Sequence, residues 1–344
     1  MRGDIEILNP IEYHGWDALL TSCEGYTFFH TTAWAKVLSE TYNYRPAYFT
    51  LVGNGRLLAL VPMMEVRSIF TGRRGVSLPF TDYCAPVIAD GFHIRDMIDF
   101  IKEYGRKCRW ESIESRGGHF PGIAVEASFY RHTLNLTSDV DQMFFGFKSN
   151  TRRNISKAIR EGVEVKIDRS PEALNEYYRL HCTTRKRHGL PPQPRAFFNK
   201  IYEHIISKDL GRVLLASYRK RNIAGSVFFN FQNQSLYKFG ASEYAYQHLR
   251  ASDLAMWEGI KWHAQNGYRS LCLGRTALDN TGLRRFKARW SADEQIINYY
   301  KYDVRQDSFV TETSLVKDSY RRILSKMPIP LLKVLGSLLY QHVG

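Results

Sequence analysis

Apolar and polar residues change period along this chain, and the changes predict alternating helices and strands. A helix is expected at 31–42, with Thr31 or Thr32 as its N-cap, because a threonine hydroxyl can accept a hydrogen bond from a free amide of the first turn. Two apolar runs around Gly53-Asn54-Gly55 predict a β-hairpin, since asparagine and glycine tolerate the positive φ of tight turns. The next expected elements are an amphipathic helix in 90–107 ended by Gly105, a strand at 131–137 and a helix at 138–160.

The second half repeats this order of elements. It predicts two helices at 171–189 and 195–207, three short strands between 212 and 242, a long helix at 251–267 stopped by Gly267, and strands at 270–274 and 294–303. Helix, strand meander, helix and strand therefore occur in both halves. This order indicates a duplicated α/β unit.

A meander followed by a long helix is similar to the order found in GNAT-type acyltransferases. Those enzymes hold the pyrophosphate of CoA on a glycine-containing turn at a helix start, where backbone amides meet the phosphate. Here the equivalent stretch is QHLRAS (247–252), with Arg250 and Ser252 where glycines would stand. A Cβ atom at these places would block close approach of the backbone, so we expect the fold without the CoA cradle.

Size and charge narrow the possibilities. A chain of 344 residues favours two domains, and its formal charge of +14 requires an anionic partner: nucleic acid, a phosphorylated small molecule or an acidic membrane. The five scattered cysteines show no CxxC pair, which argues against a zinc site and for a reducing compartment. We find neither a signal peptide nor an apolar run of about 18 residues, so a cytoplasmic protein is expected.

The segment 147–162, FKSNTRRNISKAIREG, concentrates positive charge: five cations and one acid. Its periodicity fits a solvated surface helix as well as a helix that faces phosphate in or beside a cleft. The pattern alone leaves both open.

Several motifs occur together in the order seen in the FemAB/FemX family of aminoacyl-tRNA-dependent transferases. They are WAKV (34–37), FKSNTRRNISKAIREGVEVKI (147–167), RHG (187–189), YKFGAS (237–242), WEGIKWHAQNGY (257–268) and GLRRFKARW (282–290). The chain resembles that family over roughly residues 25–303. The resemblance implies a mixed α/β fold of two tandem GNAT-like domains with a cleft between or beside them. We expect domains at 1–135 and 136–303, followed by a tail at 304–344.

The chain departs from the family pattern in places. It lacks the long helical arm that some members insert in the second domain. Cys272-Leu273-Gly274-Arg275 stands where relatives tend to carry Asp-x-Gly-Gly, and Ser252 stands where they often have proline. The cation Arg275 suggests a different acceptor, so these departures concern the peptidoglycan substrate more than the fold.

The resemblance also implies site residues. Lys36, close to Trp34, would contact the diphosphate of a nucleotide-sugar precursor, and Arg187 would be a second phosphate-binding cation. Lys287 would be catalytic, stabilising negative charge on the tetrahedral intermediate. For each cation the alternative is an ordinary surface charge. The further expected substrate-binding residues are Trp34, Tyr237, Arg153, Arg250 and Arg275.

No nucleophilic triad stands out, and an attacking amine needs none. Tyr237, Ser242, Glu243 and His188 are possible acid or base groups. We expect no metal or cofactor; the donor is expected to be an aminoacyl-tRNA, with acyl-CoA as the alternative.

The last residues, SYRRILSKMPIPLLKVLGSLLYQHVG (319–344), mix cations with leucines around two prolines. Two short amphipathic helices here would either lie on an anionic membrane surface or pack on the body.

The expected function is transfer of an aminoacyl or acyl group to an amine of a cell-envelope precursor, such as peptidoglycan or a lipid-linked saccharide, at the inner face of the cytoplasmic membrane. The alternatives are a CoA-dependent acyltransferase of exopolysaccharide or envelope assembly and a non-catalytic, membrane-associated scaffold.

Overall fold

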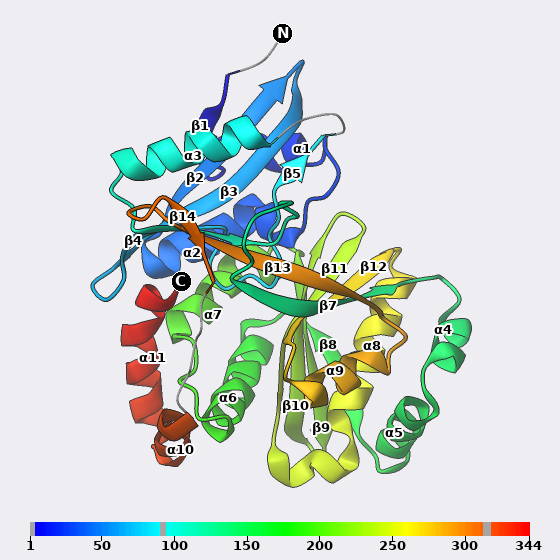
Figure 1. The fold of residues 1–344 in the computed structure, drawn as a ribbon. Helices are drawn as coiled ribbons and strands as arrows, with labels where there is room; N and C mark the ends of the chain where they lie inside the picture. Colours follow the sequence, from blue (N-terminus) through cyan, green and yellow to red (C-terminus); the bar gives the residue numbers. More distant parts are fainter. Residues whose placement is uncertain (1–3, 90–93, 312–317) are drawn as a thin grey trace. The chain divides into compact units, whose positions relative to one another are not determined.

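The computed structural model describes residues 4–89, 94–311 and 318–344 (Figure 1). The chain forms two compact units. Unit 1 is Met1–Phe129, Ile296–Ser314 and Leu338–Gly344, and unit 2 is Tyr130–Gln295 and Leu315–Ser337. The units therefore interleave along the sequence. This division differs from the expected linear one, because residues 296–303 and the end of the tail belong with the N-terminal part.

Unit 1 is built on a sheet whose strands follow the order β1 (Glu6–Leu8), β2 (Arg45–Gly53), β3 (Arg56–Ser68), β4 (Gly72–Val76), β6 (Ser112–Arg116) and β13 (Asp293–Asp303). Short strands β5 (Val87–Ile88) and β14 (Ser308–Val310) pair with β3 and β13. The predicted hairpin is confirmed: Asn54 and Gly55 have φ values of 52° and 73°. The β4–β6 pair is parallel, and α3 (Arg95–Lys107) lies between its strands in the sequence.

The first helices of unit 1 are α1 (Trp16–Leu20), the 3-10 turn η1 (Phe28–His30) and α2 (Thr32–Tyr42). The helix predicted at 31–42 is confirmed, with the Thr31 hydroxyl accepting from the Trp34 amide at 3.4 Å. Gly105 was predicted to end α3, and this is wrong, since the helix continues to Lys107. A Cβ atom at position 105 would lie 3.2 Å from the Trp110 ring, so this glycine allows close packing inside the helix.

The strands of unit 2 follow the order β7 (Ala127–Asn135), β12 (Ser270–Ala277), β11 (Gln234–Ser242), β10 (Arg221–Phe231), β9 (Gly211–Tyr218) and β8 (Glu164–Asp168). As in unit 1, an antiparallel meander ends in a parallel pair, β11 with β12, and a helix, α8 (Ala251–Gln265), lies between these strands in the sequence. The repeated plan is thus present in three dimensions.

Helices cover both faces of the unit 2 sheet. Phe228 and Phe229 are neighbours on β10 and so point to opposite faces. Phe228 packs on the His263 ring of α8, whereas Phe229 meets Phe239, which contacts α6 (Pro171–Arg187) and α7 (Arg195–Ile201). One π-helical turn, η2 (Tyr202–Ile206), follows α7, and η3 (Tyr244–Leu249) precedes α8.

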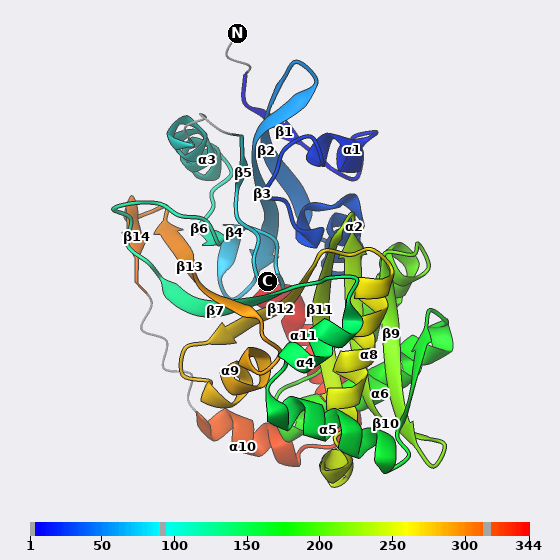
Figure 2. The ribbon, with the colours of Figure 1, turned by 90° about the vertical axis from the view of Figure 1, so that its right-hand side faces the viewer.

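The single helix predicted at 138–160 is wrong. Two helices are present, α4 (Val140–Gly146) and α5 (Ser149–Arg160), which Figure 2 shows with α8 in the same unit. Phe147 adopts an extended conformation with ψ of 153°. Its buried ring packs on Trp257 and Trp290 at centroid distances of 5.5 and 5.2 Å. This core contact interrupts the helix.

The tail forms the two predicted helices, α10 (Asp318–Lys326) and α11 (Ile329–Val343). One face of α11 packs on the protein: Leu332 is fully buried, and a Cβ atom at Gly336 would lie 2.1 Å from the Pro192 carbonyl oxygen. Within unit 1, the Tyr44 hydroxyl donates to the carbonyl oxygens of Tyr340 and Gln341. The tail is therefore seated on the body, although Leu331 and Val334 remain 56% and 59% exposed.

Candidate active site

A pocket of about 300 Å³ lies at the amino end of α8, and we call it the α8 pocket. Its walls come from the ends of β10 and β11, the η3 turn, the first residues of α8, and the segment formed by α9 (Thr281–Ala288) with Arg289. The amino end of a helix can bind an anion, because its first amides lack intrahelical partners.

Arg250 determines how α8 begins. It is the N-cap residue, it has a φ of 59°, and its side chain gives no capping hydrogen bond. The side chain is exposed at the pocket and makes no ion pair among the residues that the structure describes. Arg250 therefore places an exposed positive charge beside the open amides of the helix.

Arg289 supplies a second cation to the same pocket. Its guanidinium forms an ion pair with Asp253, which also accepts a hydrogen bond from Asn154 Nδ2 at 3.2 Å. The Arg289 Nε atom is buried and has no hydrogen-bond partner among the described residues. Burial, followed by the nearby charge of Arg250, lowers the pKa of Arg289 to about 10. Arg289 stays charged at neutral pH, and an incoming anion would offset the cost of placing two cations side by side.

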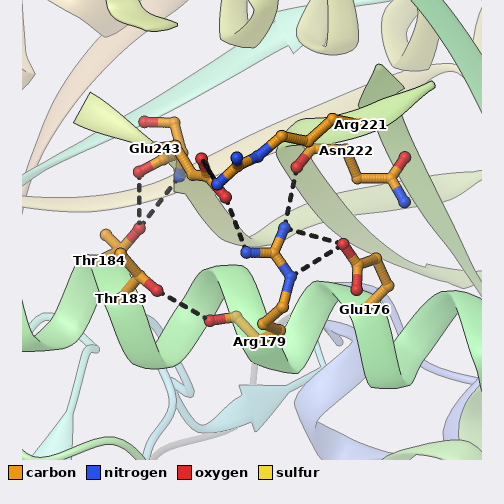
Figure 3. A network of polar contacts seen from close by, with 8 residues as sticks. Glu176, Arg179, Thr183, Thr184, Arg221, Asn222 and Glu243 are labelled. Carbon is orange, nitrogen blue, oxygen red and sulfur yellow. Dashed lines mark hydrogen bonds and ion pairs between the residues drawn. The ribbon is translucent and has the colours of Figure 1, made fainter. Parts of the chain in front are cut away.

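Glu243 also lines the α8 pocket, and Figure 3 shows how it is held. Arg179 of α6 donates to Glu243 Oε1 at 2.7 Å, and Arg221 donates to Oε2 at 2.8 Å. Arg179 also binds Glu176 at 2.8 Å and the Asn222 carbonyl oxygen at 2.9 Å. Both carboxylate oxygens thus accept hydrogen bonds from arginines. Glu243 therefore links the end of β11 to α6 and β10, and its carboxylate is not available as the acid or base that the sequence suggested.

A second hollow, of about 570 Å³, follows α5, and we call it the basic groove. Among the residues lining it are four cations: Arg152, Arg153, Lys157 and Arg160. None of the four makes an ion pair within the described chain. Ile155 and Ala158 bury the opposite face of the helix. Asn154 lines this groove and binds Asp253 of the α8 pocket, so the two hollows are neighbours.

Lys287 does not point into either hollow. Its side chain is buried, and Nζ donates to the carbonyl oxygens of Gly274 and Arg275 at 2.9 and 2.8 Å. Gly274 has a φ of 73°, so the ammonium holds an irregular point of β12. The nearby charge of Lys287 adds to burial in lowering the pKa of His132, whose Nε2 lies 3.0 Å from a Glu294 oxygen.

The region around both hollows is similar to known proteins. Residues 146–288 match the family model described as Acetyltransferase (GNAT) domain, which includes α5, every residue of the basic groove except Phe144 and every residue of the α8 pocket except Arg289. A structure described as FemX superposes with a TM-score of 0.66 at 12% identity, covering 86% of this chain and 96% of that one. The chain has a FemX-like fold. The predicted resemblance to the FemAB/FemX family and the two-domain GNAT-like fold are confirmed.

Two further relatives agree with the FemX-like fold. A tandem GNAT protein from the clavulanic acid biosynthesis pathway superposes with a TM-score of 0.54 at 9% identity, covering 88% of this chain and 98% of that one. The UDP-N-acetylmuramoylpentapeptide-lysine N(6)-alanyltransferase of Weissella viridescens is 22% identical over 144 residues. That match spans 41% of this chain and 41% of the curated relative.

The remaining site residues expected from the FemX-like resemblance lie in different surroundings. Trp34 is fully buried among the core residues, with its ring 5.3 Å from that of Phe29, and its contact with the substrate stays a prediction. Tyr237 lies inside unit 2, where its ring packs on Phe228 at 5.4 Å. Burial raises its pKa to about 12, so it is a poor acid or base at neutral pH.

The other expected cations are more accessible. Lys36 is half-buried on α2 of unit 1. Arg187 is exposed at the end of α6, with its guanidinium 5.7 Å from the centre of the Tyr244 ring at the start of η3, and it lines neither hollow. Arg275 is half-buried on β12. The structure thus joins Arg250 and Arg153 in adjacent hollows, and the expected cleft between the two halves stays a prediction.

Sequence reasoning missed Arg289, Asp253 and Asn154. One signal was available: Asp253 follows Arg250 and Ala251-Ser252 at a helix start, where an acid beside a phosphate site calls for a neutralising cation. The identity of that cation depends on how α9 packs against α8, which local sequence does not reveal.

Proposed function

We propose that this chain is an N-acyltransferase that moves an aminoacyl or acyl group onto an amine of a phosphate-bearing cell-envelope precursor. The observation that carries the proposal is the α8 pocket, which combines two arginines with the open amino end of a helix. All residues of the pocket except Arg289 lie in the GNAT-matched region. Such a site suits the phosphates of an activated acyl donor.

The acceptor class follows from a relative. The printed name of the W. viridescens protein describes alanyl transfer to N6 of a lysine in a UDP-linked muramoyl pentapeptide. That molecule offers both an amine and a diphosphate. A chain with a formal charge of +14 is suited to such an anionic acceptor. Lys36 and Arg187 remain the residues proposed to hold its phosphates.

The reaction needs little from the protein beyond positioning. The acceptor amine attacks the acyl carbonyl carbon, the new N–C bond forms, and the bond from that carbon to the carrier oxygen or sulfur breaks. The proton lost by the amine passes, directly or through water, to the departing carrier atom. Arg250 and Arg289 would fix the phosphates of the carrier, so that the carbonyl stays in reach of the amine.

The basic groove favours an aminoacyl-tRNA as the donor. Four cations without ion pairs follow α5 for three turns and border the α8 pocket, and spaced cations are what a nucleic-acid backbone requires. Acyl-CoA is the second candidate, supported by the GNAT match but opposed by the side chain of Arg250 at the position of a glycine.

We also propose a peripheral location at the inner face of the cytoplasmic membrane. No helix within 4–89, 94–311 or 318–344 is long and apolar enough to cross a bilayer. The exposed residues Leu331 and Val334 of α11 lie on the same helix as Lys333, and Ile323 of α10 is 64% exposed next to Arg322. Apolar residues beside cations suit an anionic interface.

The test is a donor and acceptor screen with the purified full chain. Charged tRNA pools and acyl-CoAs are offered with UDP-linked and lipid-linked amine acceptors, and products are identified by mass spectrometry. Arg250→Gln should lower kcat/KM at least roughly tenfold, the usual cost of one charge-assisted contact. The control is Arg169→Gln, an exposed arginine paired with Asp209 that lines neither hollow.

The outcomes separate the alternatives. Transfer from tRNA that depends on Arg250 supports the proposal. Transfer from acyl-CoA alone replaces the donor. Acceptor binding without transfer from any donor would make the chain a non-catalytic scaffold and overturn the assignment as an enzyme.

A further inference from the structure

The hairpin between β3 and β4 of unit 1 carries two neighbouring apolar side chains in the open. Ile69 is 81% exposed, the largest fraction among the large apolar residues that the structure describes. Phe70 is 68% exposed, which is among the next largest. Single exposed apolar residues are ordinary on protein surfaces, but two adjacent ones at a hairpin tip form a projecting apolar wedge.

The turn holds these side chains outward. The Ser68 hydroxyl accepts hydrogen bonds from the amides of Phe70 at 3.1 Å and Thr71 at 3.2 Å. Because the tip has this fixed conformation, the apolar side chains cannot turn inward without breaking those bonds. The exposure therefore follows from how the hairpin is built.

The end of α11 adds to this surface within the same unit. The Phe70 ring contacts the His342 ring at a centroid distance of 5.1 Å. Leu338 stands one turn before His342 on that helix and is 59% exposed, and Val343 is 61% exposed. The hairpin tip and the last turns of α11 thus place four exposed apolar side chains around one contact; Figure 1 shows this hairpin close to the chain end marked C.

The charges around the tip favour an anionic partner. Residues 66–81 contain Arg67, Arg73 and Arg74 and no acid. Arg73 is exposed, Arg67 keeps 55% of its side chain exposed while paired with Glu65, and Arg74 is buried against Glu114. The carboxylate of Glu111, which pairs with Arg305, lies beside Gly72 at the same hairpin. Because these acids are each paired with an arginine, Arg73 leaves the surround of the wedge with a net positive charge, which suits the interface of an anionic bilayer.

We infer that the β3–β4 tip, with the last turns of α11, inserts into the headgroup region of an anionic phospholipid bilayer. This inference rests on the membrane association in the proposed function, and it adds a contact that the tail segment alone does not provide. It would place unit 1 directly at a membrane, as expected for an enzyme whose acceptor is linked to lipid.

The test compares the full chain with Ile69→Ser/Phe70→Ser and with Ile69→Ser alone. Binding is measured by co-sedimentation with vesicles of phosphatidylcholine containing phosphatidylglycerol, and with pure phosphatidylcholine vesicles. Ile296→Ser removes a 65% exposed side chain from β13 and is the matched control. We expect the double variant to bind phosphatidylglycerol vesicles at least roughly tenfold more weakly than the parent, because two apolar side chains no longer enter the bilayer. Ile296→Ser should bind as the parent does.

A second readout is independent of sedimentation. Ile69→Trp should show a blue shift of its added emission when phosphatidylglycerol vesicles are present. Equal binding of the double variant and the parent would overturn the inference, as would equal losses in the double variant and Ile296→Ser. Loss of binding with unchanged transfer to a soluble acceptor would support it. Absent transfer in the parent and in every variant, while only the double variant loses vesicle binding, would count against the proposed function alone.

Discussion

Replacing Lys287 by methionine tests whether its buried ammonium stabilises the folded protein. The side chain is 4% exposed, and Nζ donates to two main-chain carbonyl oxygens at 2.9 and 2.8 Å. Methionine keeps the length and apolar stem but removes both donors. Hydrogen bonds from a charged group contribute about 1.5–3 kcal/mol each to the free energy of unfolding. Removing the ammonium also removes the unfavourable burial of its charge, which offsets part of that loss. We expect a net loss of about 3 kcal/mol.

The assay is thermal and urea unfolding of Lys287→Met beside the parent. For a domain of this size, about 3 kcal/mol lowers Tm by roughly 6–12 °C. Lys166→Met is the control, since Lys166 is 76% exposed and its ion pair with Asp168 lies at the surface, where such pairs contribute about 1 kcal/mol or less.

Transfer rates complete the test. If Lys287 stabilises the developing oxyanion, kcat should fall about 100-fold to 1000-fold at a temperature where the variant is folded. If it only fixes β12 at Gly274, the loss in rate should be small once folding is secured. An unchanged Tm in Lys287→Met would refute our account of the two carbonyl contacts.

Two further predictions concern pH and the tail. Burial lowers the pKa of His181 to about 3 and the pKa values of His30 and His263 to about 4. As pH falls below about 6.5, the unfolded chain therefore binds protons that the folded chain does not, and the free energy of unfolding at pH 5.5 should be about 4 kcal/mol lower than at pH 7.5. Identical urea midpoints at the two pH values would contradict the burial of these rings. Gly336→Ala would place a Cβ atom 2.1 Å from the Pro192 carbonyl oxygen, so α11 should no longer pack on the protein. The variant should therefore be cleaved faster than the parent in limited proteolysis. Ser337→Ala changes an exposed position and should be cleaved at the parental rate.

Elements governed by local rules could be predicted from the sequence. The hairpin at Asn54-Gly55 follows from backbone conformations that few residues tolerate, and the start of α2 follows from one hydroxyl at Thr31. Errors arose where distant residues decide. Gly105 reads as a helix stop but serves packing on Trp110, and the break at Phe147 exists because its ring belongs to the core of unit 2.

The same distinction holds for the site. Arg250 could be found because it replaces a glycine in a turn whose chemistry is understood, and the basic face of α5 because its charges are close in sequence. The pairing of Arg289 with Asp253 could not, since the two residues are 36 positions apart and meet only when α9 packs beside α8. The burial of Lys287 depends equally on strand β12, which bends at Gly274 to present two carbonyl oxygens.

The interleaving of the two units constrains how the chain can fold during synthesis. Strand β6 of unit 1 pairs with residues 299–303 of β13, which are made only after nearly all of unit 2. Until then the growing chain carries an incomplete first sheet with the edge of β6 unpaired, and exposed edges invite wrong pairing. A ribosome must therefore deliver about 170 residues before the first unit can close, so the two halves cannot be separated at the gene level by a single cut.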